Sequence, residues 1–186
     1  MIAGYVEMDL VVHCGSSTLG EYVNTLSTAE VFSSWWEGEA IMGKPQEYVF
    51  WALKEIRKRT PFSWEGIGCD NGSEFTNQTL YKYYQKEKLE FTGSRENKKN
   101  DNAYVEQKTW TQVRKVPGYL RYDTYKELRL YKNFFQPVMK LTEKVRIGGS
   151  VKRKYDIPKT PYQRLMESNQ ISDRAKYGYI FYDATT

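Results

Sequence analysis

Three acidic residues, Asp9, Asp70 and Glu106, are of the type and spacing that could bind a hard metal ion. Asp9 lies in the apolar run Val6–Val12, where an ionised carboxylate is costly unless it is paired or metal-bound. Asp70 follows the apolar stretch Trp64–Cys69, and Glu106 lies near the start of an expected helix. Mg²⁺ and Mn²⁺ prefer oxygen ligands, and two such ions about 3.5–4 Å apart can promote phosphodiester cleavage. The three residues therefore predict a shared metal site that acts on phosphates.

Each of these carboxylates also has a purely structural explanation. Asp9 fits a buried aspartate that accepts hydrogen bonds from backbone amides. Asp70 fits a turn residue ahead of Asn71-Gly72, and Glu106 fits a capping or surface residue of a helix. The joint occurrence of all three favours the metal site over three separate structural roles.

The segments that hold the three carboxylates resemble the catalytic cores of DDE transposases and retroviral integrases. These segments are residues 7–15 (EMDLVVHCG), 70–75 (DNGSEF) and 100–108 (NDNAYVEQK). The 35 residues that separate Asp70 from Glu106 are themselves a hallmark of that superfamily. The likeness is strongest to integrase-like transposases of bacterial insertion sequences, and it runs from about Gly4 through Leu165.

The resemblance implies an α/β chain with the RNase H-like fold, a mixed five-stranded sheet with helices on both faces. It implies metal-dependent cleavage of phosphodiesters and strand transfer of a mobile element, the activity of a DDE polynucleotidyl transferase. Asp9, Asp70 and Glu106 would be both the catalytic residues and the ligands of two Mg²⁺ (or Mn²⁺) ions. The implied partners are DNA, as transposon ends and target, and further copies of the chain assembled on that DNA.

Two other functions fit the same residues. One is a nuclease of the same fold, and the other is a truncated, non-catalytic remnant of a transposase that still binds DNA. The region 122–134 is shorter than the corresponding helical region of the family, which favours the remnant, whereas the intact triad argues against it. Because the chain starts at Met1, we expect the helix-turn-helix region of such transposases to be missing or separately encoded.

The basic residues indicate a polyanionic partner. The chain has 186 residues and a formal net charge of +5, which suits association with nucleic acid. We expect a catalytic core over residues 1–136 and a basic extension over residues 137–186. Taken alone, these lysine-rich stretches are better explained by a solvated surface. The candidate DNA-binding residues are Arg95, Lys98, Lys99, Asn102, Lys108, Arg114, Lys115, Lys152, Arg153 and Lys154.

The composition predicts a cytoplasmic protein without a membrane partner. No apolar run approaches the roughly 20 residues of a membrane span, and no signal peptide precedes the first expected strand. Cys14 and Cys69 both lie beside apolar runs, as buried thiols in a reducing compartment do.

Apolar periodicity and turn residues define the elements that must position the carboxylates. We expect strands over residues 4–12, 19–26, 31–41, 64–69 and 89–92. A helix should begin at Pro45 and end before Thr60, and another should run from an N-cap at Ser73 to about Lys86. A further helix over residues 125–135 should turn Leu128, Tyr131 and Phe135 inward. Residues from 136 onward read as an extended basic arm, with a short helix starting at Thr160.

Overall fold

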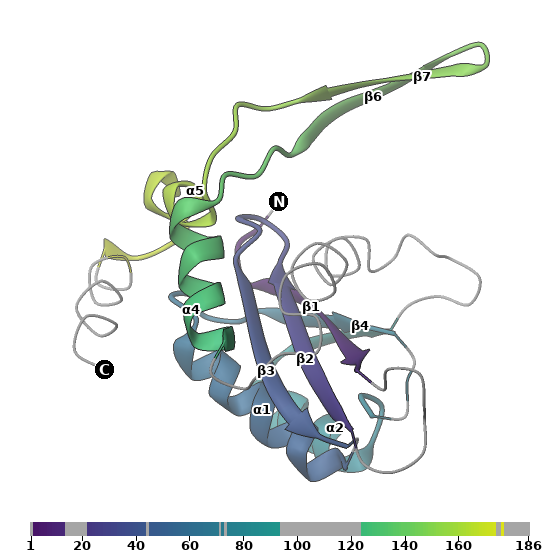
Figure 1. The fold of residues 1–186 in the computed structure, drawn as a ribbon, viewed down its shortest axis with the longest axis vertical. Coiled ribbons are helices and arrows are strands. Elements are labelled where there is room, and N and C mark those ends of the chain that lie inside the picture. The colour runs from purple at the N-terminus through teal and green to yellow at the C-terminus, as the bar shows by residue number, and fades with distance from the viewer. Residues whose placement is uncertain are drawn as a thin grey trace.

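The computed structural model describes residues 2–13, 22–43, 45–70, 72, 74–93, 124–173 and 176. A five-stranded sheet in the order β3-β2-β1-β4-β5 lies at its centre (Figure 1). Strands β1, β2 and β3 pair antiparallel, whereas β1, β4 and β5 run parallel. The predicted mixed sheet is therefore confirmed. The strands are β1 (Tyr5–Val12), β2 (Val23–Glu30), β3 (Trp36–Met42), β4 (Gly66–Cys69) and β5 (Glu90–Gly93).

Alternate residues of β1 pack on opposite faces of the sheet, as the period of a strand requires. Val6, Met8 and Leu10 belong to the larger core cluster, which includes residues of α1 (Gln46–Arg59) and α2 (Gln78–Lys86). Val11 belongs to a second cluster that includes residues of β3 and α4 (Thr124–Leu130). The sheet is thus covered by helices on both faces, as predicted.

The turn between β2 and β3 falls inside a segment predicted as strand. The predicted strands over residues 19–26 and 31–41 are wrong in their bounds, because β2 ends at Glu30 and β3 begins only at Trp36. The buried Glu30 carboxylate organises this turn, since it accepts hydrogen bonds from Phe32 N at 2.9 Å and Ser33 N at 2.5 Å. Ser34 has a positive φ of 67°, which completes the reversal.

The helix after Asp70 begins later than predicted. Asn77, rather than Ser73, is the N-cap of α2, and its Oδ1 accepts a hydrogen bond from Leu80 N at 3.0 Å. Gly72 O accepts hydrogen bonds from Phe75 N and Thr76 N, so a separate turn precedes the helix. The bounds predicted for α1 are confirmed, because it begins directly after Pro45 and ends before Thr60.

The inward face predicted for the helix over residues 125–135 is only partly correct. Leu128 is buried, but Tyr131 is 55% exposed and Phe135 is 72% exposed. The last turn is the π-helix η2 (Tyr131–Phe135), whose wider winding rotates the buried face. Lys132 and Asn133 are buried in place of the two aromatic residues.

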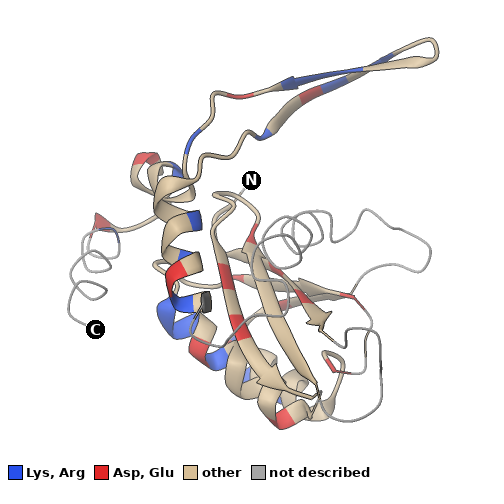
Figure 2. Ribbon diagram, viewed as in Figure 1, with Lys and Arg blue, Asp and Glu red and all other residues tan. Residues whose placement is uncertain are grey.

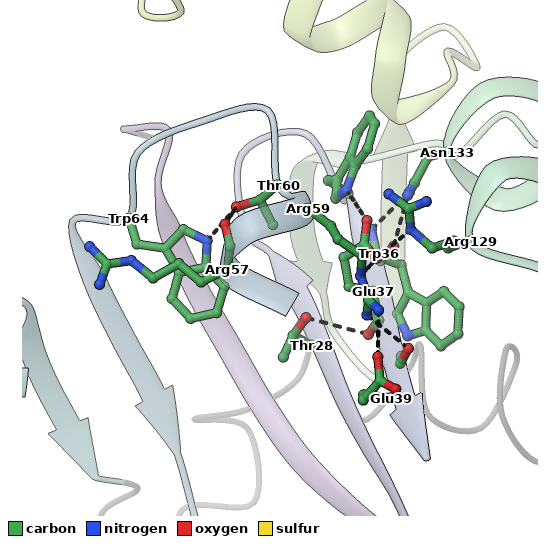
Figure 3. Close-up of polar contacts among 12 residues, drawn as sticks. Thr28, Trp36, Glu37, Glu39, Arg57, Arg59, Thr60, Trp64, Arg129 and Asn133 are labelled. Carbon is green, nitrogen blue, oxygen red and sulfur yellow. Dashed lines mark hydrogen bonds and ion pairs between the residues drawn. The ribbon is translucent and has the colours of Figure 1, made fainter. Parts of the chain in front are cut away.

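The free edge of β3 is partly closed by Asn133. Its Oδ1 accepts a hydrogen bond from Trp36 N, and its Nδ2 donates one to Trp36 O, both at 2.8 Å (Figure 3). A side-chain amide thus replaces a neighbouring strand at one residue, which limits edge-to-edge pairing.

A long β-hairpin, the arm, projects away from the sheet (Figure 1). It consists of β6 (Leu141–Ile147) and β7 (Ser150–Tyr155), joined by a turn at residues 148–149. Every residue of both strands is exposed. The helix predicted to start at Thr160 is confirmed as α5 (Pro161–Glu167), because Thr160 and Gln163 form a capping box. The described part of the chain has no helix long and apolar enough to cross a membrane.

Candidate active site

Asp9 lies in the middle of β1, on the face of the sheet that α4 covers. Met8 and Leu10 pack in the cluster on the opposite side, and Val11 packs with α4 residues, so strand alternation places Asp9 with Val11. Its partner across the β1–β2 ladder is Ser27, whose Oγ accepts a hydrogen bond from Trp36 Nε1 at 3.0 Å. The Asp9 side chain is half-buried.

Asp70 follows the last residue of β4, the strand that pairs in parallel with β1. In the register of this pair Met8 lies opposite Cys69, so Asp9 and Asp70 occupy the next position along the two strands. Cys69 packs in the same cluster as Met8, and alternation then turns both aspartates to the other face. The structure thus places Asp9 on β1 and Asp70 directly after the adjacent strand β4.

The turn after Asp70 brings a further carboxylate to this end of β4. Gly72 N donates a hydrogen bond to Asp70 Oδ1 at 3.2 Å. A Cβ on Gly72 would lie 2.7 Å from Glu74 Oε2 and 3.1 Å from Asp70 Oδ1. Both carboxylates therefore border the same small space, which a glycine leaves open. Sequence reasoning assigned Glu74 to a first helical turn and gave it no place in the site.

The local charge at the end of β4 is negative. The pKa of the Cys69 thiol is raised to about 12, mainly by burial and in addition by the nearby charges of Asp70 and Glu74. Among the residues that the structure describes, no lysine or arginine forms an ion pair with Asp70. Asp70 is also exposed. An exposed carboxylate without a cationic partner is available to an incoming cation.

The third predicted carboxylate, Glu106, lies outside the described residues. The same is true of seven predicted DNA-binding residues, and their placement stays a prediction. Within the described ranges, no three histidine, cysteine, aspartate or glutamate residues are grouped closely enough to hold a metal ion. The described part of the site is thus one carboxylate pair with Glu74 beside it. The seven residues are Arg95, Lys98, Lys99, Asn102, Lys108, Arg114 and Lys115.

The other three predicted DNA-binding residues, Lys152, Arg153 and Lys154, lie on β7 in the exposed arm. The base of the arm contacts the β2–β3 turn, where Lys140 Nζ donates a hydrogen bond to Val31 O at 2.7 Å. That turn lies at the end of the sheet where β1 begins, whereas Asp70 lies where β4 ends. The structure therefore does not bring the arm residues together with the aspartates, because β6 and β7 project away from the sheet that contains β1 and β4 (Figure 1).

A buried ionic network at β3 was missed by sequence reasoning. Arg129 Nε donates to Glu37 Oε2 at 2.6 Å, and Arg59 forms ion pairs with Glu37 and with Glu39 (Figure 3). Trp35 Nε1 donates to the other oxygen of Glu37 at 2.9 Å. The network joins α1, through Arg59, and α4, through Arg129, to the edge strand β3. Because both of its carboxylates already have cationic partners, it leaves no open position for a metal ion.

No protein-family model matches this chain. It is 37% identical over 173 residues to the uncharacterized protein y4rM of Sinorhizobium fredii. That match covers 88% of this chain and 49% of the relative, so the chain spans about half the length of the relative.

Three solved structures have similar folds: two viral integrase catalytic cores and a chain of a viral intasome. The catalytic core domain of BIV integrase aligns with a TM-score of 0.60 and 15% identity, over 88% of this chain and 94% of that domain. The HTLV-2 integrase catalytic core domain in complex with magnesium aligns with a TM-score of 0.58 and 10% identity, over 74% of this chain and 92% of that chain. A chain of the simian T-cell lymphotropic virus intasome in complex with PP2A regulatory subunit B56 gamma aligns with a TM-score of 0.61 and 11% identity, over 85% of this chain and 68% of that chain.

The strand order, the helices on both faces and these alignments define the class of fold. The chain has the RNase H-like fold of integrase catalytic cores.

Proposed function

We propose that this chain is a metal-dependent polynucleotidyl transferase of the transposase and integrase type, with Asp9, Asp70 and Glu106 as its catalytic triad. The observation that carries the proposal is the β1–β4 register, which sets Asp9 and Asp70 side by side on one face of the sheet. The carboxyl ends of parallel strands are where α/β folds gather functional residues. The similar folds of viral integrase cores support the same activity.

The carboxylates of this site suit Mg²⁺ or Mn²⁺, of which we propose two ions. Asp70 offers an exposed carboxylate that forms no ion pair with the described lysines and arginines, and Asp9 lies at the matching position of the next strand. Hard divalent cations take such oxygen ligands together with substrate phosphate and water. One of the similar structures, the HTLV-2 integrase core, is a complex with magnesium. Glu106 would complete the ligand set.

In this proposal the residues of the chain orient the reacting phosphate and concentrate negative charge for the cations. The metal, when bound, activates the attacking oxygen and stabilises the leaving one. The Gly72 N–H holds Oδ1 of Asp70 through its hydrogen bond, and Oδ2 would then be the oxygen that meets a cation. Rigid strands on both sides keep the aspartates in register, which is the positioning that phosphoryl transfer requires.

We propose double-stranded DNA as the substrate and a homo-oligomer on DNA as the working assembly. The net charge of +5 and the exposed cations of β7 support a DNA partner. The basic residues Arg95 to Lys115 would hold phosphates near the triad, as backbone contacts do in protein–DNA complexes.

A nicking assay with Mn²⁺ tests this function. Wild-type protein, Asp70→Asn and Glu65→Gln are incubated with duplex DNA that carries the ends of the element, and nicked and joined products are resolved on a gel. Glu65 is the matched control, because it is an exposed carboxylate at the opposite end of β4. Asp70→Asn should lose about 10³-fold in rate, since it removes a charged ligand. Glu65→Gln should cleave at the wild-type rate.

Three other results of this assay have definite meanings. An Asp70→Asn variant as fast as wild type would show that Asp70 is only a turn residue. Nicking without joined products would indicate a nuclease of the same fold. A wild-type protein that binds DNA and never nicks it would indicate a non-catalytic remnant.

A further inference from the structure

The arm carries cations on a surface that the rest of the described chain does not cover. Each residue of β6 and β7 is exposed. The two strands hold five cationic side chains and one carboxylate, that of Glu143 (Figure 2). A two-stranded hairpin of this kind is marginally stable alone in water. The cations are Lys144, Arg146, Lys152, Arg153 and Lys154.

The strand register divides these charges unequally between the two faces of the arm. Lys144 lies directly opposite Arg153, and Arg146 lies opposite Val151, so three cations share one face, here called the basic face. Glu143 lies opposite Lys154, and Lys152 lies opposite Val145, so the mixed face has two cations and one carboxylate. Like charges directly opposite each other destabilise a ladder. The basic face is therefore explained by an external partner better than by the stability of the hairpin.

The base of the arm is fixed to the body of the protein. Arg164 donates hydrogen bonds to Asp156 at 2.6 and 3.1 Å and to Val138 O at 2.6 Å, which ties α5 to both ends of the hairpin. Lys140 Nζ donates to two carbonyl oxygens of the β2–β3 turn. An arm held in this way costs less entropy to order when it binds a partner.

The charges favour a polyanion over a second copy of this chain as the partner. A second copy carries the same formal net charge of +5, so its overall field repels the basic face, whereas a polyanion is attracted to it. Lys144 and Arg146 lie about 7 Å apart along β6. Each strand of duplex DNA presents a phosphate every 3.4 Å of its axis. Neighbouring cations on the basic face can therefore reach phosphates of nearby nucleotides.

We propose that the basic face of the arm lies across the phosphate backbone of duplex DNA and holds it independently of sequence, through Lys144, Arg146 and Arg153. This contact is distant from the aspartates, so it anchors DNA flanking the reacting phosphate. The inference rests on the proposed function to the extent that DNA is the substrate.

The two faces supply a matched pair of variants for the test. Lys144→Gln with Arg153→Gln removes two charges from the basic face, and Lys152→Gln with Lys154→Gln removes two from the mixed face. Full-length proteins are titrated into a fluorescent duplex oligonucleotide, without divalent metal, over a series of salt concentrations. The basic-face variant should flatten the slope of log K against log salt by about 2 and weaken binding about 60-fold at 0.1 M salt. Lys152 and Lys154 were predicted from the sequence to bind DNA, but the register places them on the face opposite the proposed contact. The mixed-face variant should therefore change the slope by less than about 0.5.

Three outcomes would overturn the inference. Equal losses in both variants would mean that the arm acts only through its total charge. Unchanged binding in both would remove the arm from the DNA interface. A basic-face variant that keeps its DNA affinity but loses self-association in sedimentation would make a second copy the partner. Because binding is read without metal, failure of the nicking assay leaves this result unaffected.

Discussion

The carboxylates of β3 and the carboxylate of Asp70, at the end of β4, differ in burial and in their ionic partners. Glu37 is 1% exposed, forms ion pairs with Arg129 and Arg59, and accepts a hydrogen bond from the indole of Trp35. Asp70 is exposed, and among the described residues its carboxylate accepts a hydrogen bond from the backbone N–H of Gly72. The charge of Glu37 is neutralised within the chain, whereas the charge of Asp70 is available to a ligand. The contrast separates acidic residues that stabilise the fold from those proposed to bind metal.

The largest expected effect comes from breaking the ionic network at β3. Arg129→Met leaves the buried Glu37 carboxylate with only part of its compensation, so the free energy of unfolding should fall by about 3 kcal/mol. Chemical denaturation monitored by circular dichroism measures this loss. The double variant Arg129→Met/Glu37→Gln should regain part of it, because the uncompensated charge is gone. If Arg129→Met costs no more than a surface substitution, the network does not hold the edge of the sheet.

A smaller effect is expected at the base of the arm. The hydrogen bonds from Arg164 are the main cause of a pKa of Asp156 below its usual value, although partial desolvation opposes them. A lowered folded pKa means that the ionised form is stabilised by folding. This contribution is full above the unfolded pKa of about 3.9 and is lost as the pH falls through the lower folded value.

The variant Asp156→Asn isolates that contribution. At pH 7 it should cost about 1–2 kcal/mol, near the lower end of the range for hydrogen bonds to charged groups, because the pair is partly exposed. The difference from wild type should shrink as the pH is lowered through the range below 3.9, as measured by thermal melting at each pH. Glu167→Gln is the control, because its pair with Lys159 is exposed and should contribute little. A difference that is constant with pH would contradict the role of the ionised carboxylate.

The sequence predicted the carboxylate pair because its signals are local. A charge in an apolar strand identifies Asp9, and a strand that ends in a turn identifies Asp70. The ionic network of β3 has no such signal, since Arg129 lies 92 residues from Glu37 along the chain. The face of α4 was misjudged beyond Leu128 because a π-helical turn cannot be foreseen from a 3.6-residue period.

The boundaries of the helices and strands also depend on contacts that local sequence signals do not reveal. Ser73 is as good an N-cap by type as Asn77, and only the backbone hydrogen bonds to Gly72 O decide between them. The arm was predicted as extended and basic, but its two unequal faces depend on strand register, which follows from the turn at residues 148–149. The position of Glu106, outside the described residues, stays a prediction.

Thermal melting with and without Mn²⁺ tests the central claim, that Asp70 is a metal ligand, most directly. Wild type should be stabilised by metal, by about 2.7 kcal/mol at a concentration 100 times the dissociation constant. Without metal, Asp70→Asn should be at least as stable as wild type, because the carboxylates near Gly72 repel one another. With Mn²⁺ it should gain much less, whereas Glu65→Gln should gain as much as wild type. An Asp70→Asn variant stabilised by Mn²⁺ to the same extent as wild type would contradict the account.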